Sequence, residues 1–89
     1  MAFRQRFLSS WIVSSDGYRV RYRDRASWLY EDPGRRAVIG AEVDADGRTI
    51  AVFSGQVWLN GSAASESDDE VVERVTAALR WSGYAVDVV

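Results

Sequence analysis

Apolar and charged residues alternate strictly between Tyr18 and Arg23, which is the clearest pattern along the chain. Successive side chains of an extended backbone point to opposite faces, so this alternation predicts a β-strand with one buried face. The apolar face would carry Tyr18, Val20 and Tyr22. The opposite face would carry only arginine: Arg19, Arg21 and Arg23.

Turn residues divide the first two thirds of the chain into short segments of this kind. S-S-D-G ends at Gly17, D-P-G-R spans residues 32–35, and D-A-D-G-R spans residues 44–48. Pro33 and Gly34 fit the two corners of a type II turn, and Gly47 fits the left-handed position of a three-residue hairpin loop. Apolar stretches lie between and after these turns, so the sequence predicts an antiparallel β-meander of about five or six strands.

The hydrophobic period changes after Ser67. Apolar residues then recur three and four positions apart, which predicts one amphipathic helix, over about residues 68–82, packed on a face of the sheet. The residues of this stripe are Val71, Val72, Val75, Ala78 and Leu79. Ser67 and Glu70 have the S-x-x-E spacing of an N-terminal capping box, and Gly83 fits the position after the helix. Glu70 can also pair with Arg74 one turn later.

The last residues, Y-A-V-D-V-V from Tyr84 to Val89, predict a final short strand, so the fold class is α+β. The chain of 89 residues has the size of one domain, 1–89, in which we expect residues 1–11 to be a loosely ordered or edge segment. No stretch approaches the ~20 apolar residues of a membrane span, and the start lacks the apolar core of a signal peptide. Cysteine is absent, which fits a reducing compartment, so we expect a cytoplasmic protein without membrane contact.

The residue types present restrict the chemistry that the chain can carry out. Histidine and cysteine are both absent, which removes most zinc sites, Ser-His and Cys-His nucleophiles, and the usual general base near neutral pH. D-A-D-G at residues 44–47 resembles a fragment of a calcium loop, but an acidic position is missing and Phe53 stands where the loop needs glutamate, so a hairpin turn is the better interpretation. We therefore expect no enzyme activity, no metal and no cofactor.

The arginine stripe of Arg19, Arg21 and Arg23 has two interpretations. It could be a basic face that binds phosphate or an acidic partner. Alternatively it is the solvent face of a strand whose charges pair across the sheet with Glu31 and Glu42. The net charge of −2 favours the second interpretation and argues against nucleic-acid binding.

Two further features are candidates for binding a partner. One is the acidic run before and within the predicted helix, where five carboxylates fall in eight residues: Glu66, Asp68, Asp69, Glu70 and Glu73. The other is a pair of tryptophans, Trp58 and Trp81, which lie off the apolar faces of their elements and would be partly exposed. Partly exposed tryptophans are frequent anchors of protein interfaces, but an indole can equally cap the end of a small core by lying flat under a loop. Capping and the helix dipole already explain most of the acidic run, so partner binding would be its second role.

Several stretches together resemble a known family. A meander strand is centred on Glu42 (A-V-I-G-A-E-V), a later strand has Trp58 before a polar loop (Q-V-W-L-N-G), and an acid-started helix is followed by G-Y-A-V-D-V. This pattern, over about residues 17–89, resembles the immunity protein 74 family of bacterial polymorphic toxin systems. The resemblance implies a single α+β domain that binds and neutralises a cognate secreted toxin, and it supplies no catalytic residues.

The resemblance and the residues leave two functions open. The first is a cytoplasmic immunity protein; if its toxin is a basic nuclease domain, the acidic run could meet the basic cleft and speed association. The second is a small structural or regulatory module that self-associates, as a homodimer, through a strand edge or an aromatic face.

Overall fold

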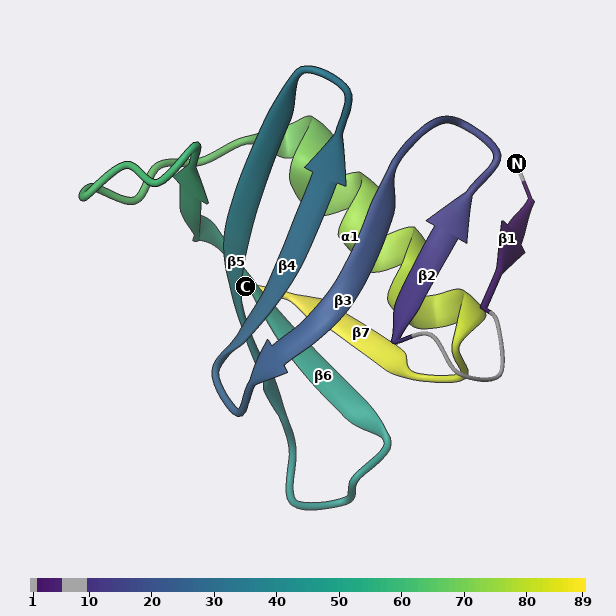
Figure 1. The fold of residues 1–89 in the computed structure, drawn as a ribbon. Helices are drawn as coiled ribbons and strands as arrows, with labels where there is room; N and C mark the ends of the chain where they lie inside the picture. Colours follow the sequence, from purple (N-terminus) through teal and green to yellow (C-terminus); the bar gives the residue numbers. More distant parts are fainter. Residues whose placement is uncertain (1, 6–9) are drawn as a thin grey trace.

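The computed structural model describes residues 2–5 and 10–89, and it contains one sheet and one helix in those ranges (Figure 1). The sheet has seven strands in this part of the chain, and their spatial order is their order in the sequence. The elements are β1 (Phe3–Arg4), β2 (Trp11–Ser14), β3 (Arg19–Asp24), β4 (Ser27–Asp32), β5 (Arg35–Val43), β6 (Thr49–Leu59), α1 (Asp69–Trp81) and β7 (Ala85–Val88).

The predicted α+β class is confirmed. Strands β1 to β6 form an antiparallel meander, and α1 then carries the chain back so that β7 pairs with β6 in parallel. A parallel pair needs a crossover of this kind, and the helix supplies it. The N-terminal segment contributes the edge strand β1, whereas residues 1 and 6–9 of that predicted segment lie outside the described residues.

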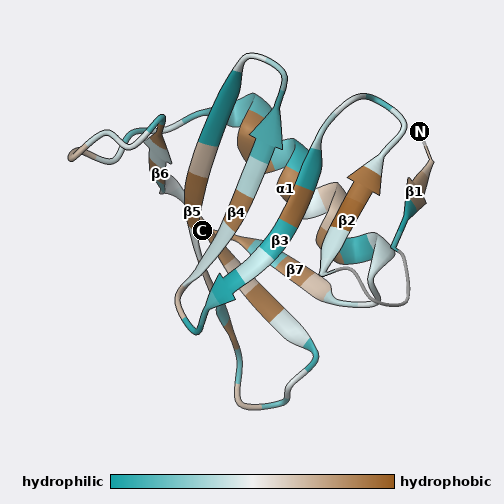
Figure 2. Cartoon of the chain, viewed as in Figure 1, coloured by the Kyte–Doolittle hydropathy of each residue, from teal (hydrophilic) through white to brown (hydrophobic). Residues whose placement is uncertain are grey.

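The core lies between α1 and one face of the sheet (Figure 1). Along both the strands and α1, hydrophobic segments alternate with hydrophilic ones, as expected for elements buried on one side only (Figure 2). Tyr18 and Val20 are buried as the alternation predicts, but Tyr22 on the same face is 50% exposed and packs edge-on against Trp28. The fully buried side chains include Tyr30, Ile39, Ile50, Val57, Val71 and Leu79. None of the described residues belongs to a helix long and apolar enough to cross a membrane.

The helix begins one residue later than the capping-box prediction requires. Asp68, not Ser67, is the N-cap, and its carboxylate accepts a 3.0 Å hydrogen bond from the Val71 amide. Both residue types cap helices well, and Asp68 also gains a contact with Arg35 that the local sequence does not reveal. The C-terminal prediction is confirmed: Gly83 has φ +102° and its amide bonds the Arg80 carbonyl, while Tyr84 bonds the Leu79 carbonyl.

Two hairpin turns occur where they were predicted but differ in detail. Gly34 does not have the positive φ of a type II turn; instead the Asp32 side chain accepts a 2.9 Å hydrogen bond from the Gly34 amide. Gly47 has the predicted left-handed conformation (φ +69°), but the connection between β5 and β6 spans residues 44–48 and is not a three-residue loop. Asp46 bonds the amides of Arg48 and Thr49 in this loop, so its carboxylate closes the turn.

Candidate functional site

The helix covers only one face of the sheet, and the strand register aligns a row of side chains on the other. Trp11 pairs with Arg21, Arg21 with Leu29, Leu29 with Val38, and Val38 with Trp58. Cross-strand neighbours point to the same side of a sheet, so these five residues form one row across β2 to β6. We call this surface the helix-free face; Figure 1 views the sheet from this side, with α1 behind the strands.

A second row beside the first is rich in arginine. It runs from Arg4 through Val13, Arg19 and Glu31 to Arg36. The Glu31 carboxylate forms an ion pair with Arg19 at 2.7 Å and lies 3.7 Å from the Arg36 guanidinium. The predicted pairing of the arginine stripe with Glu31 across the sheet is therefore confirmed. The predicted pairing with Glu42 is wrong, because β4 separates β5 from β3 and Glu42 aligns with Ala51 of β6.

Trp11 at one end of the first row lies under two arginines. The guanidinium carbon of Arg19 is 4.0 Å from the centroid of the Trp11 ring, and that of Arg21 is 4.7 Å away. Such cation–π contacts hold the long arginine side chains flat along the sheet. The positions of Arg19 and Arg21 in the arginine stripe are therefore set by contacts with the Trp11 ring, and that of Arg19 also by its ion pair with a carboxylate.

Trp58 at the other end of the row is partly buried and lies between two shallow hollows. One hollow is bordered by Arg36 and Glu31, and the other by Arg23, Ser27 and Gln56. Gln56 lies over Gly40, where an added Cβ would come within 3.0 Å of the Gln56 Cβ. Because Gly40 has no side chain, the Gln56 side chain can lie directly against the sheet at this position.

The helix-free face has the opposite charge to the rest of the protein. Across β1 to β4 and the start of β5 it carries five arginines (Arg4, Arg19, Arg21, Arg23 and Arg36) and two carboxylates (Asp24 and Glu31), a net charge of +3, while Glu42 of β5 and Asp87 of β7 lie farther along the same face. The remaining six arginines and eleven acidic residues of the sequence, Glu42 and Asp87 included, give −5, which accounts for the overall −2. The net charge of the whole sequence therefore gives no sign of this basic surface.

The acidic run lies on the other side of the molecule, and part of it is neutralised within the fold. Arg35, at the start of β5, donates to Asp32 (2.9 Å), to Asp68 (3.1 Å) and to Glu70. Arg74 lies 3.9 Å from Glu70, which is the predicted pair one helical turn apart. Two of the five carboxylates, Asp68 and Glu70, thus help to attach the helix start to the β4–β5 hairpin.

A buried tyrosine joins this cluster of charges. The Tyr30 hydroxyl donates a 2.6 Å hydrogen bond to Asp32, and Arg74 donates a 2.7 Å hydrogen bond to the same hydroxyl. Burial raises the pKa of Tyr30, and the adjacent carboxylate raises it further. Burial opposes ionisation of Asp32 as well, but hydrogen bonds from Tyr30, Arg35 and the Gly34 amide outweigh it and lower the pKa of Asp32 to about 2.

The arrangement of this cluster suits a structural role. The hydrogen bonds with Asp32 raise the pKa of Arg35 above its ordinary value, and those with Tyr30 raise the pKa of Arg74, so both remain charged. A general acid or base needs a pKa near the working pH, whereas Asp32 is ionised and saturated with donors. No group of three or more acidic residues within the described ranges is placed to hold a metal ion.

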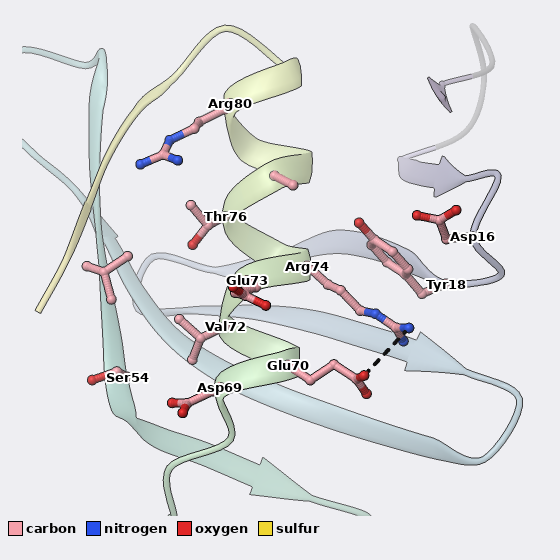
Figure 3. Close-up of a pocket in the computed structure, with 12 residues that line it drawn as sticks. Asp16, Tyr18, Ser54, Asp69, Glu70, Val72, Glu73, Arg74, Thr76 and Arg80 are labelled. Carbon is pink, nitrogen blue, oxygen red and sulfur yellow. Dashed lines mark ion pairs between the residues drawn. The ribbon is translucent and has the colours of Figure 1, made fainter. Parts of the chain in front are cut away.

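Figure 3 shows a shallow hollow that follows α1 on both of its sides. Asp69, Val72, Thr76 and Arg80 face Ser54 on one side, while Glu70 and Arg74 face Tyr18 on the other. Asp69 and Glu73 are exposed, and no other described residue forms an ion pair with them. They are the members of the acidic run within the helix that remain available to a partner.

The predicted partner-binding residues do not form a single surface. Trp58 is on the helix-free face, whereas Asp69 and Glu73 are on the helix. Trp81 is 47% exposed at the helix end and contacts Phe3, with ring centroids 6.0 Å apart. Glu66 precedes the helix, and its backbone bridges to Val57.

Sequence reasoning missed three members of the row, Trp11, Leu29 and Val38. The alternation in S-W-L-Y-E already places Leu29 opposite Trp28 and Tyr30, but alignment with Trp11 and Trp58 requires the strand register. In comparisons with known proteins, no family model matches the chain and no solved structure matches it.

Proposed function

We propose that this protein is an immunity protein that binds a cognate secreted toxin domain and neutralises it without catalysis, in the cytoplasm. Two observations support the proposal: the sequence resemblance and the row of side chains on the helix-free face. The row is the structural observation on which the proposal mainly rests. Trp11 and Trp58 end this row, and Leu29 and Val38 lie between them, all partly buried on the sheet face that no helix of the described residues covers. Tryptophan and arginine are the residue types most enriched in energetically dominant interface positions.

Inhibition by binding alone also agrees with the use of the charged groups. The most strongly shifted carboxylate, Asp32, is engaged by Tyr30 and Arg35 in attaching the helix to the sheet. The helix-free face instead offers mainly arginine, tryptophan and aliphatic side chains around the row. These groups suit recognition of another protein.

The test is co-expression of this chain with the C-terminal domain of a large exported protein, which the proposal expects an adjacent reading frame to encode. Growth should be restored by the wild type, and the two purified proteins should form a stable complex. A toxin that remains active in the presence of excess folded protein would refute the proposal. If the recovered toxin were covalently modified or cleaved, neutralisation would be catalytic, and only the claim of inhibition by binding alone would be refuted.

Self-association is a second candidate function, favoured by the open edge of β7. This strand pairs only with β6 among the described strands, and its last residue, Val88, and the following Val89 are 51% and 66% exposed. An unpaired edge can add a strand from a second copy, although the strand is only four residues long and carries Asp87. A concentration-independent monomer in light scattering would exclude this candidate.

A further inference from the structure

The helix-free face combines an apolar centre with a basic border. Leu29, Val38 and Trp58 are consecutive in the row across β4, β5 and β6. Arginines border them on both sides along the strands: Arg19 and Arg36 on one side, Arg23 on the other. The whole row from Trp11 to Trp58 crosses five strands, about 19 Å at the usual strand spacing. An interface core of this kind buries its apolar centre and leaves polar groups at its rim.

The arginines of this border are accessible. The side chains of Arg36, Arg23 and Arg19 are 83%, 51% and 47% exposed. Arg19 and Arg36 share one carboxylate, Glu31, so the ion pairs within the face leave positive charge uncompensated. A planar guanidinium with free N–H groups accepts a carboxylate in a bidentate geometry.

We propose that the partner of this face is a protein surface with an apolar centre bordered by aspartate and glutamate. The inference rests on the proposed function and deepens it, since it specifies the chemistry of the toxin surface. It differs from binding of a basic nuclease cleft by the acidic run. Asp68 and Glu70 of that run are already bonded to Arg35, and the run and Trp58 lie on different surfaces.

A nucleic acid fits the same face less well. Single-stranded nucleic acids bind to aromatic side chains on which successive bases stack. Here the Trp11 ring is covered by Arg19 and Arg21, and the centre of the row is aliphatic at Leu29 and Val38. The charge of −5 on the rest of the molecule also opposes the approach of a polyanion.

Selection of peptides from a random displayed library tests the inference without knowledge of the partner. The wild type is the target, and Arg21→Glu/Arg36→Glu is the charge-reversed variant. Arg25→Glu/Arg48→Glu is the matched control, because both residues are exposed in hairpin loops and the change in net charge is the same. If circular dichroism shows that the Arg21 variant does not fold, Arg4→Glu/Arg36→Glu replaces it, since both of its sites are exposed.

The expected peptides combine acidic with aliphatic or aromatic residues. Their affinity should fall about tenfold or more in the charge-reversed variant and remain within about twofold in the control. It should also weaken between about 0.1 M and 1 M NaCl, as the Debye length shortens from about 10 Å to about 3 Å.

Three results would overturn the inference. They are enrichment of basic peptides, equal binding to the wild type and the charge-reversed variant, and tighter binding of a single-stranded deoxythymidine oligonucleotide than of the best peptide. Failure of the rescue experiment with the peptide result intact would reject the toxin as the partner but leave the acidic-partner surface in place. Rescue that survives charge reversal would reject the surface and leave the immunity function in place.

Discussion

Arg74 of the helix donates a 2.7 Å hydrogen bond to the hydroxyl of Tyr30, whose side chain is fully buried in β4. The same hydroxyl donates to Asp32, so a cation, a phenol and a carboxylate form one chain of hydrogen bonds. Arg35 extends this chain to Asp68 at the helix start. The orientation of α1 on the sheet therefore depends on polar contacts as well as on the apolar core.

Replacement of Arg74 should destabilise the fold. Arg74→Met keeps much of the apolar stem but removes the donor to the buried Tyr30 hydroxyl, and we expect a loss of about 2 kcal/mol. Urea unfolding measures this loss. Arg80→Met is the control on the same helix, because Arg80 is exposed, and it should change stability by less than about 0.5 kcal/mol. Similar values for the two variants would show that the Arg74–Tyr30 contact contributes little.

The lowered pKa of Asp32 predicts acid sensitivity. The pKa is about 2 in the folded state against an ordinary 3.8, so the unfolded chain binds a proton more readily. The stabilisation is complete above about pH 4 and is lost as the pH falls towards 2, with a size of about 2 kcal/mol. Unfolding free energies between pH 5 and pH 2 should therefore fall more steeply for the wild type than for Asp32→Asn. Parallel curves would contradict the assignment.

The position of the N-cap can be tested with two neighbouring substitutions. Asp68→Ala removes the hydrogen bond to the Val71 amide and the ion pair with Arg35, and it should cost about 1–2 kcal/mol. Ser67→Ala should be nearly neutral, because Ser67 is exposed and lies outside the helix. Thermal and urea unfolding of both variants give the comparison. The reverse order would restore Ser67 as the cap.

Thr76 offers a substitution that should stabilise the protein. Its hydroxyl is buried and has no hydrogen-bond partner within the described part of the chain. Thr76→Val replaces the hydroxyl with a methyl group of similar size and should raise the unfolding free energy by about 0.5–1 kcal/mol. Destabilisation by Thr76→Val, measured in urea, would indicate that the hydroxyl is satisfied in solution.

The sequence predicts the helix and the strands better than it predicts the contacts between them. Alternation at Tyr18–Arg23, the D-P-G-R turn and the apolar stripe of the helix are local patterns, and each leads to the observed element. The N-cap could not be chosen in this way, because Asp68 is selected partly by Arg35, a residue 33 positions away. The Trp11–Trp58 row likewise depends on four strand registers, each fixed by packing of the opposite face.

The central claim is tested most directly by titrating the purified toxin domain, which the proposal expects an adjacent reading frame to encode, with this protein and its variants. Calorimetry should give a wild-type Kd in the nanomolar range, about −12 kcal/mol. Arg21→Glu/Arg36→Glu should weaken binding about a hundredfold or more, whereas Asp69→Asn/Glu73→Gln should remain within about threefold of the wild type. Absence of binding by the wild type would contradict the immunity function. Loss of binding in the Asp69/Glu73 variant alone would place the interface on the helix and contradict the assignment to the helix-free face.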